Sequence, residues 1–372
     1  MDATGSSTMI MLIAVNLLIP LIGIIWAIMP FLMKKSEVFA VTVPETAQHD
    51  PYLKGLKRRY FWIMVLVSVV LTAVGFLVDF GSNEYAGYIY MTAGMLLVLL
   101  IGYGLMLYSR SKVRSYKKGQ NWIAQQELVT AAFYEEAPKA ISLMWNLLYL
   151  PVMIITLVIG FAAYVHMPDQ IPMHVGLNGV VSRYAEKSPL VIWQVVFIQA
   201  IFVVIFLACH AMIKRSKKVV NPNAPASSAF AYGLFSRAWS IYLLALGLII
   251  CIAMIGLTLS YAGIVSLMQW GVFIVIAVLI AIVGAIALSV VYGQGGSRVF
   301  ARMQESDTMP ADDDSRWKLG TFYFNSEDPS LFLHKRFGVG WTFNFARPAV
   351  WLCIAAFIII MVVFAVVTTV MS

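Results

Sequence analysis

Charged residues are scarce in this chain. They make up 12% of its 372 residues, whereas hydrophobic residues make up 61%. A typical soluble domain is about one quarter charged and about one half apolar. With a mean hydropathy of +0.83, the composition excludes an ordinary water-soluble fold and indicates that lipid covers much of the surface.

Cysteine is scarce as well. Cys209, Cys251 and Cys353 each lie in an apolar run, and no two of them have the spacing of metal ligands. We expect three buried thiols and no disulfide framework. The sequence also lacks the HExxH, Walker and GxSxG motifs of common hydrolases. It therefore predicts a non-enzymatic protein with no catalytic residue, no bound metal and no cofactor.

Long apolar runs are abundant. Eight of them approach the ~20 residues that an α-helix needs to cross a bilayer, and none contains Asp, Glu, Lys or Arg. The runs cover residues 9–33, 61–78, 88–108, 143–165, 190–213, 238–261, 265–291 and 349–371. Because backbone groups in lipid must pair internally, these runs predict an all-α integral membrane protein with about eight transmembrane helices.

Lysine and arginine predict the orientation in the membrane. Of the 26 in the chain, 24 lie in residues 34–60, 110–142, 214–237 and 292–348. Positive residues concentrate in cytoplasmic loops, so we expect these four segments in the cytoplasm and both termini outside. The net charge of +8 then reflects topology and contact with membrane lipids, not a nucleic-acid partner.

Spans and loops divide the chain into five expected parts. They are residues 1–142 with three helices and basic loops, 143–213 with two helices and the outer loop 164–189, 214–291 with a linker and two helices, 292–348 as a cytoplasmic segment with small β-strands, and 349–372 as the final helix.

The outer loop 164–189 holds the first set of candidate site residues. Those proposed to contact a ligand or partner are His166, Asp169, Pro172, His174, Asn178, Gly179 and Lys187. We expect a compact cap that meets an extracellular peptide or an envelope protein. His166, Asp169 and His174 leave a metal-dependent surface enzyme open as an alternative, although their spacing defines no metal motif.

This loop resembles a known domain of unknown function. The residues that carry the resemblance are Pro172, His174, Asn178-Gly179 and Lys187-Ser188. The same domain opens the immunity proteins that protect bacilli from the sporulation-delaying toxin. The resemblance implies a bacterial plasma-membrane protein with a role in immunity, although Val181-Ser182 stand where that domain usually has an aspartate.

Residues 314–351 look very like a second domain of unknown function, which follows the first in Gram-positive membrane proteins. The resemblance rests on Trp317, Lys318, Gly320, Tyr323, Asn325, Asp328-Pro329, Phe332, Lys335-Arg336, Gly338, Gly340, Thr342, Asn344, Arg347 and Pro348. Residues 38–60 also look like the first cytoplasmic loop of those proteins. Together the resemblances imply a Gram-positive multi-spanning membrane protein of unknown function.

The cytoplasmic segment supplies the second set of candidate residues. Those proposed for an interface are Trp317, Tyr323, Asn325, Asp328, Pro329, Lys335, Arg336, Asn344 and Arg347. Residues 321–325 and 340–345 alternate in polarity, which predicts an antiparallel strand pair beneath the bundle. The acidic run 305–314 that precedes them is expected to be mobile.

Such a strand pair makes specific predictions about burial. It would bury Phe322, Phe324, Phe343 and Phe345. It would also turn Lys335, Arg336 and Arg347 toward lipid phosphates. The alternative is that these aromatic residues form only a belt at the membrane interface.

Besides the metal-dependent surface enzyme, two function classes remain open. A sensor, immunity or regulatory protein is favoured, because both unusual stretches face water and no predicted span carries a charge. The alternative is a transporter or a carrier of lipid or peptide, although Gln194 and Gln199 in the fifth span lie about 140° apart on a helix and do not clearly share a face.

Overall fold

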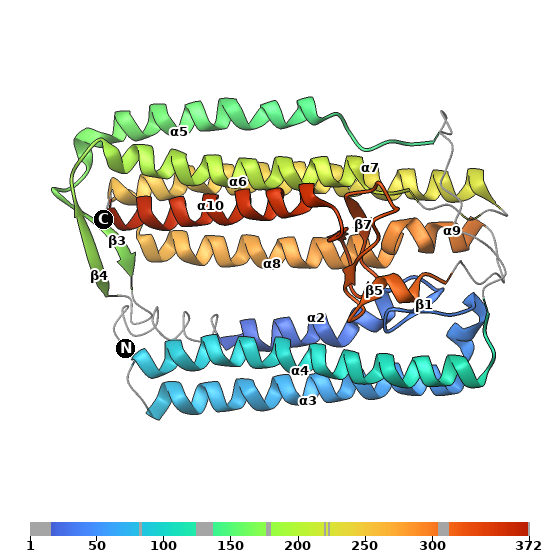
Figure 1. The fold of residues 1–372 in the computed structure, drawn as a ribbon. Helices are drawn as coiled ribbons and strands as arrows, with labels where there is room; N and C mark the ends of the chain where they lie inside the picture. The colour runs from blue at the N-terminus through green and yellow to red at the C-terminus, as the bar shows by residue number, and fades with distance from the viewer. Residues whose placement is uncertain are drawn as a thin grey trace.

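The structure, a computed structural model, describes residues 16–81, 84–123, 137–175, 180–218, 221, 224–303 and 312–370 (Figure 1). Its α-helices are α2 (Leu18–Leu32), α3 (Pro51–Gly81), α4 (Glu84–Gly119), α5 (Tyr149–Ala163), α6 (Leu190–Arg215), α7 (Pro225–Tyr261), α8 (Leu267–Tyr292), α9 (Ser297–Met303) and α10 (Pro348–Val370). Short 3-10 helices are η1 (Glu45–His49), η2 (Leu143–Leu148), η3 (Tyr164–His166), η4 (Gln294–Gly296) and η5 (Asp314–Arg316).

The helices confirm an all-α membrane protein. Among the described residues, seven helices are long and apolar enough to cross a membrane, and α2 is a shorter apolar helix within the expected first span. The expectation of three buried thiols is confirmed for Cys251 and is wrong for Cys209, which is half-buried, and for Cys353 of α10, which is exposed. Cys353 lies on an apolar helix that needs no protein neighbour, because lipid covers it.

Several helices continue beyond the membrane. Helix α7 has 37 residues and is therefore about 55 Å long, whereas the hydrocarbon core is about 30 Å thick. Its one charged residue, Arg237, lies near its N-terminal end. Helix α4 likewise ends in Lys117 and Lys118. The basic residues of both helices thus lie outside the apolar runs that predict the spans.

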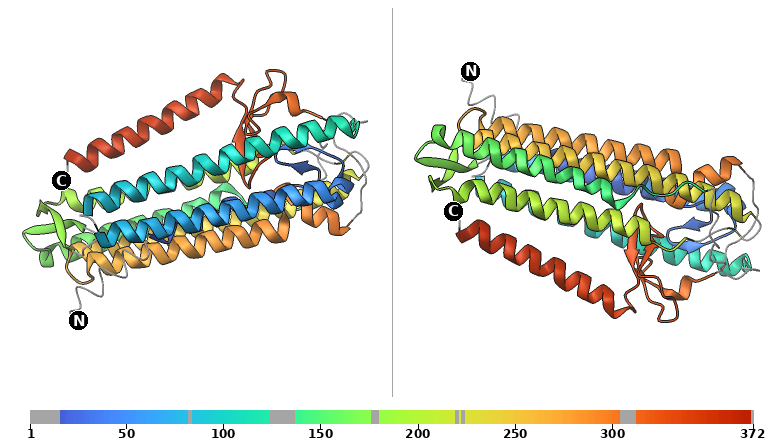
Figure 2. Two further views of the ribbon diagram at one scale, coloured as in Figure 1. Left: turned by 90° about the horizontal axis from the view of Figure 1, so that it is seen from below. Right: turned by 90° about the horizontal axis from the view of Figure 1, so that it is seen from above.

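Helix packing divides the molecule into two groups. Helices α2, α3 and α4 pack on one another, and α5, α6, α7 and α8 form a second group, while extensive helix–helix packing does not extend between the groups in the described residues. Figure 1 shows the two groups running side by side, and Figure 2 shows α10 diverging from the other helices along most of its length. In that group Gly247 allows close approach, since a Cβ there would lie 2.2 Å from Tyr149 Oη.

The two ends of the molecule carry different small structures. Strands β3 (Gln170–Val175) and β4 (Val181–Glu186) form an antiparallel hairpin at one end, where α10 ends (Figure 1). At the opposite end lie the described parts of the four basic segments. The alternation read from the sequence is therefore present in the fold, and the assignment of the basic end to the cytoplasm stays a prediction.

The basic end contains three further hairpins. They are β1 (Glu37–Val38) with β2 (Val41–Thr42), β5 (Trp317–Lys318) with β6 (Phe322–Tyr323), and β7 (Phe332–His334) with β8 (Trp341–Phe343). The expected antiparallel pair between 321–325 and 340–345 is wrong. These stretches belong to separate hairpins that meet at one parallel bridge, between Tyr323 and Asn344.

The burial pattern of these strands is also the reverse of the expectation. Phe322 and Phe324 are exposed, and Phe343 and Phe345 are half-buried. The alternate residues Tyr323, Asn325, Thr342 and Asn344 are buried instead. The reason is that the polar groups of this second set hydrogen-bond to one another and to the backbone, which removes the cost of burying them.

Candidate functional site

The cytoplasmic site is built around residues 312–347, which we call the clamp. The clamp lies at the basic end, and Figure 1 shows β7 against the α5–α8 group and β5 toward the α2–α4 group. Its contacts reach the first loop and α4 on one side and α6, α7 and η4 on the other. The hairpin β7–β8 touches both groups.

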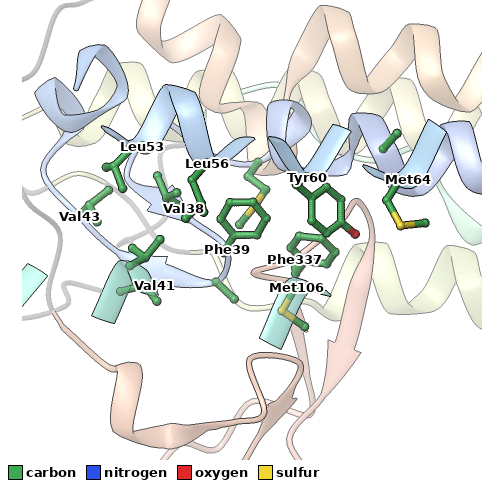
Figure 3. Close-up of a cluster of buried hydrophobic side chains, with 14 of the residues drawn as sticks. Val38, Phe39, Val41, Val43, Leu53, Leu56, Tyr60, Met64, Met106 and Phe337 are labelled. Carbon is green, nitrogen blue, oxygen red and sulfur yellow. The ribbon is translucent and has the colours of Figure 1, made fainter. Parts of the chain in front are cut away.

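The turn of β7–β8 inserts one aromatic side chain into the α2–α4 group. Phe337 is 6% exposed and belongs to the same apolar cluster as Val38, Phe39 and Met106 (Figure 3). Its ring centroid lies 6.3 Å from that of Phe39 and 6.3 Å from that of Tyr60. Gly338, which follows it with φ +89°, adopts a conformation that favours glycine and lets the chain turn back at once.

The strands of the same hairpin pack on the α5–α8 group. His334 and Trp341 face each other across the hairpin, and their rings lie 5.5 and 5.7 Å from that of Phe235 in α7. Trp341 also lies 6.0 Å from Trp239, one helical turn further along α7. One hairpin therefore holds both helix groups through aromatic packing.

A side-chain amide fixes the position of this hairpin. Gln294, in the link between α8 and α9, accepts a 3.1 Å hydrogen bond from Gly340 N and donates one from Nε2 to Gly340 O. Gln294 is buried, and both the oxygen and the nitrogen of its side-chain amide hydrogen-bond to the backbone of one residue, Gly340. The glycine-rich exit from α8 thus has a structural partner in the clamp.

A buried charge cluster joins the clamp to the first loop. Arg336 forms ion pairs with Asp313 and Asp314 and donates a 2.8 Å hydrogen bond from Nη2 to Thr42 Oγ1. Lys117 of α4 pairs with Asp314 at 3.1 Å. Arg336 also lies over Trp317, with Cζ 5.3 Å from the ring centroid. The prediction that Arg336 faces lipid phosphates is therefore wrong, because carboxylates of its own chain surround it.

The environment of the cluster shifts its titration. Burial alone would raise the pKa of Asp314, but Arg336 and Lys117 outweigh that effect and bring this pKa to about 2. Burial raises the pKa of Glu37 above its ordinary value, despite opposing charges on Lys34 and Arg336. At neutral pH Asp314 is thus ionised, whereas ionising Glu37 costs more than ionising an exposed glutamate.

A second network surrounds Asp328. Its Oδ2 accepts hydrogen bonds from Lys217 Nζ at 2.6 Å and from Tyr323 Oη at 3.0 Å. Burial would raise the pKa of Asp328, and the bond from Lys217 reverses this effect and lowers it. Arg347 Nε donates to Asp328 O at 2.8 Å, and Asn344 Nδ2 donates to the same oxygen at 3.1 Å. Lys217 follows α6, so this network ties the clamp to the α5–α8 group.

The remaining cytoplasmic candidates divide into two kinds. Trp317 is buried, and its Nε1 donates to Asp313 Oδ2 at 3.2 Å. Asn325 donates from its backbone N to Asn344 Oδ1 at 3.1 Å. Pro329 and Lys335 are exposed. The clamp therefore uses most of its candidate residues to hold itself together, and only the last two remain on its surface.

The outer hairpin places its candidates differently. His166 and Asp169 are exposed, and His174 Nδ1 lies 2.7 Å from Ser182 Oγ across the hairpin. Lys187 Nζ donates to Met167 O at 2.7 Å. Pro172 pairs with Tyr184 in the register, while Asn178 and Gly179 lie outside the described residues. In the part of the chain that the structure describes, no three His, Cys, Asp or Glu side chains are grouped to hold a metal ion.

Several residues of the site were not foreseen from the sequence. They are Thr42, Lys117, Lys217, Gln294, Asp313, Asp314 and Phe337. Asp312, Asp313 and Asp314 end the acidic run that is expected to be mobile, and all three form ion pairs. The remainder of that run, residues 305–311, lies outside the described residues. The one available signal was charge complementarity between this run and the cations of the clamp.

Two segments of the chain match known families. Residues 152–200, which cover most of α5, the outer hairpin and the first part of α6, match a domain of unknown function (DUF1648). Residues 326–351 match a family of unknown function (DUF5808). No curated protein and no solved structure matches the chain. The matched segments coincide with the two stretches whose resemblance the sequence suggested, although Trp317, Tyr323 and Asn325 precede the second match. The chain is therefore a multi-pass membrane protein that carries two regions related to families of unknown function.

Proposed function

We propose that this protein is a non-enzymatic sensor, immunity or regulatory protein of the bacterial plasma membrane, in which the clamp couples the two helix groups. One observation carries the proposal. The hairpin β7–β8 buries Phe337 among the residues of α2–α4 and packs Trp341 on α7 of the other group. A single small element thus depends on the relative position of both groups.

The packing of Phe337 favours two discrete arrangements. Packed cores do not deform continuously, so the Phe337 ring lies either inside the apolar cluster of the α2–α4 group or outside it. Releasing a buried phenylalanine into water costs about 1.5–3 kcal/mol. A ligand that separates the helix groups with a differential binding energy of this size would shift the clamp between the two arrangements.

Helix α7 connects the outer hairpin to the clamp. Ile171 of β3 is fully buried in a cluster that includes Met254 and Tyr261, near the C-terminal end of α7. The same helix carries Phe235 and Trp239 at its other end, against the clamp. A peptide or envelope component that moved the outer hairpin would therefore act on one rigid element that ends beneath Trp341.

The proposal is tested in cells. A deletion strain is challenged with antimicrobial peptides and inhibitors of envelope synthesis, and we expect greater susceptibility than in the parent. The wild-type gene and a Phe357→Ala variant on the exposed side of α10 restore the parental level, whereas Phe337→Ala does not. Unchanged susceptibility of the deletion strain across these agents would contradict the proposal.

The division into two helix groups also favours one alternative, a transporter or a carrier of lipid or peptide. Many carriers work by rocking one helix bundle against another. Gln194 and Gln199 are both buried in the α5–α8 group, and each has an Oε1 without a hydrogen-bond partner. Purified protein in vesicles that moves labelled lipid or peptide across the bilayer would support the carrier, and a sensor would leave the distribution unchanged.

A further inference from the structure

An exposed aromatic ridge covers one face of the clamp and the start of α10. We define it by Leu319, Phe322, Phe324, Phe345 and Trp351. The rings of Phe322, Phe324 and Trp351 lie 5.4, 5.7 and 5.9 Å from that of Phe345. Phe322, Phe324, Leu319 and Trp351 are 41, 40, 57 and 56% exposed. A contiguous apolar patch of this kind marks a surface that another phase or partner covers.

Helix α4 gives the depth of one edge of the ridge. Tyr103 Oη donates a 3.1 Å hydrogen bond to Leu319 O and lies 3.0 Å from Thr321 Oγ1. Tyr103 belongs to the apolar part of α4. It precedes Arg110, the first positively charged residue of this helix, by seven residues. At 1.5 Å per residue it lies about 10 Å deeper than that arginine. Leu319 is therefore held at the level where α4 enters the membrane.

Helix α10 gives the depth of the other edge. Trp351 lies in its first turn, and its Nε1 donates a 3.1 Å hydrogen bond to Phe345 O. Because α10 is long and apolar enough to cross a membrane from Pro348 onward, we place Phe345 and Trp351 at the boundary between water and lipid. Two helices from different parts of the chain thus place the ridge at the same level.

The backbone at Leu319 supports a role for its exposed side chain. Leu319 has φ +51°, a left-handed conformation that side chains rarely adopt. A glycine or asparagine would fit this turn at less cost, and the protein instead presents a leucine outward. Its neighbour Lys318 is exposed as well and supplies a cation beside the apolar ridge.

We infer that the ridge inserts into the interfacial region of the phospholipid leaflet at the basic end of the protein. Phe322, Phe324 and Trp351 occupy the boundary between acyl chains and headgroups, where aromatic side chains are favoured. The Lys318 ammonium reaches the lipid phosphates. One face of the clamp is then inserted in the membrane interface, and the packing of the lipids acts on the clamp directly.

The inference is tested with nitroxide labels on the full-length protein in phosphatidylcholine–phosphatidylglycerol vesicles. Single cysteines replace Phe324, Leu319 or Glu327 in a background in which Cys209, Cys251 and Cys353 are alanine. Glu327 is the matched control, because it is three residues from Phe324 and its side chain is 83% exposed. Oxygen, which concentrates in lipid, and a water-soluble nickel chelate report the surroundings of each label.

We expect oxygen to relax the labels at residues 319 and 324 more strongly than the nickel chelate, and the reverse order at residue 327. If the chelate relaxes residue 324 as strongly as residue 327, the ridge faces water and the inference is wrong. If neither agent reaches residues 319 and 324, another protein surface covers the ridge, and the inference is equally wrong. Two ridge positions keep the test decisive when one variant fails to fold.

Discussion

Arg336 Nη2 donates a 2.8 Å hydrogen bond to Thr42 Oγ1 across 294 residues of sequence. Both residues are buried, and Asp314 accepts bonds from Thr42 N and Thr42 Oγ1 at 3.1 and 3.0 Å. The first loop and the clamp therefore form one folded unit. Losing either partner would leave buried polar atoms unpaired, which costs about 1–3 kcal/mol for each group.

The first prediction concerns the burial of Phe337 in the apolar cluster of the α2–α4 group. Phe337→Ala removes a buried ring from the cluster with Phe39 and Tyr60, and such truncations cost about 3–5 kcal/mol. We expect a clear fall in the thermal unfolding midpoint of the protein purified in detergent. The control is Phe357→Ala, since Phe357 is 50% exposed on α10, and its midpoint should stay close to wild type. Equal midpoints for Phe337→Ala and wild type would contradict the role assigned to this ring.

The second prediction concerns stability in acid. The pKa of Asp314 is about 2 in the folded protein, below its ordinary value, so its ionised form stabilises the fold. This contribution is complete above the unfolded pKa and is lost as the pH falls from about 4 to about 2. It amounts to about 2 kcal/mol. In that pH range Asp314→Asn should therefore show a shallower loss of stability than wild type.

A matched control for this experiment is Asp169→Asn. Asp169 is exposed next to the outer hairpin, so this variant removes one carboxylate without touching the ion pairs of the clamp. If Asp314→Asn follows the wild-type slope between pH 4 and pH 2, the carboxylate does not carry the proposed stabilisation.

The third prediction concerns Glu37 and has the opposite sign. Burial raises its pKa, so the folded state is stabilised where Glu37 keeps its proton, and this advantage is lost as the pH rises through the folded pKa. Glu37→Gln keeps the shape without the charge. We expect a higher unfolding midpoint than wild type at pH 8 and a smaller difference at pH 5. A midpoint that falls at pH 8 would show that the ionised carboxylate is stabilising.

The fourth prediction compares two adjacent acidic residues. Asp328→Asn leaves Lys217 without its 2.6 Å carboxylate partner in a largely buried site, and removing one partner of a buried pair costs about 3–5 kcal/mol. Glu327→Gln removes an exposed pair with Arg316 at 3.5 Å, which contributes about 0–1 kcal/mol. Unfolding midpoints should separate the two variants. Similar losses would argue that the Asp328 network adds little.

The transmembrane helices were predictable because lipid imposes one simple rule. Every backbone group in the hydrocarbon pairs within a helix, so apolar length alone indicated the spans. Helix α7 is longer than its predicted span of 238–261, since its N-terminal extension to Pro225 packs on η4, α9 and the clamp. Hydropathy does not indicate where a helix is extended by packing on other parts of the protein.

The clamp was only partly predictable, for a different physical reason. Alternation correctly indicated short strands near Tyr323 and Thr342, but hydropathy assigned the phenylalanines to the inside. The buried face is polar because Asn325 and Asn344 bond to each other's backbone or side chain, and such mutual satisfaction depends on three-dimensional pairing. The burial of Phe337 among residues of the first loop is likewise not indicated by the sequence around Phe337.

The last prediction tests the orientation in the membrane. Because 24 of the 26 lysines and arginines lie in the four basic segments, the clamp should face the cytoplasm and the outer hairpin the exterior. His174 and Lys335 are both exposed and lie at opposite ends of the molecule, so His174→Cys and Lys335→Cys, in a background without the three native cysteines, report the two sides. A membrane-impermeant maleimide should label His174→Cys in intact cells and Lys335→Cys only after permeabilisation. The reverse pattern would invert the topology and remove the outer hairpin as the site of an extracellular ligand, because it would then face the cytoplasm.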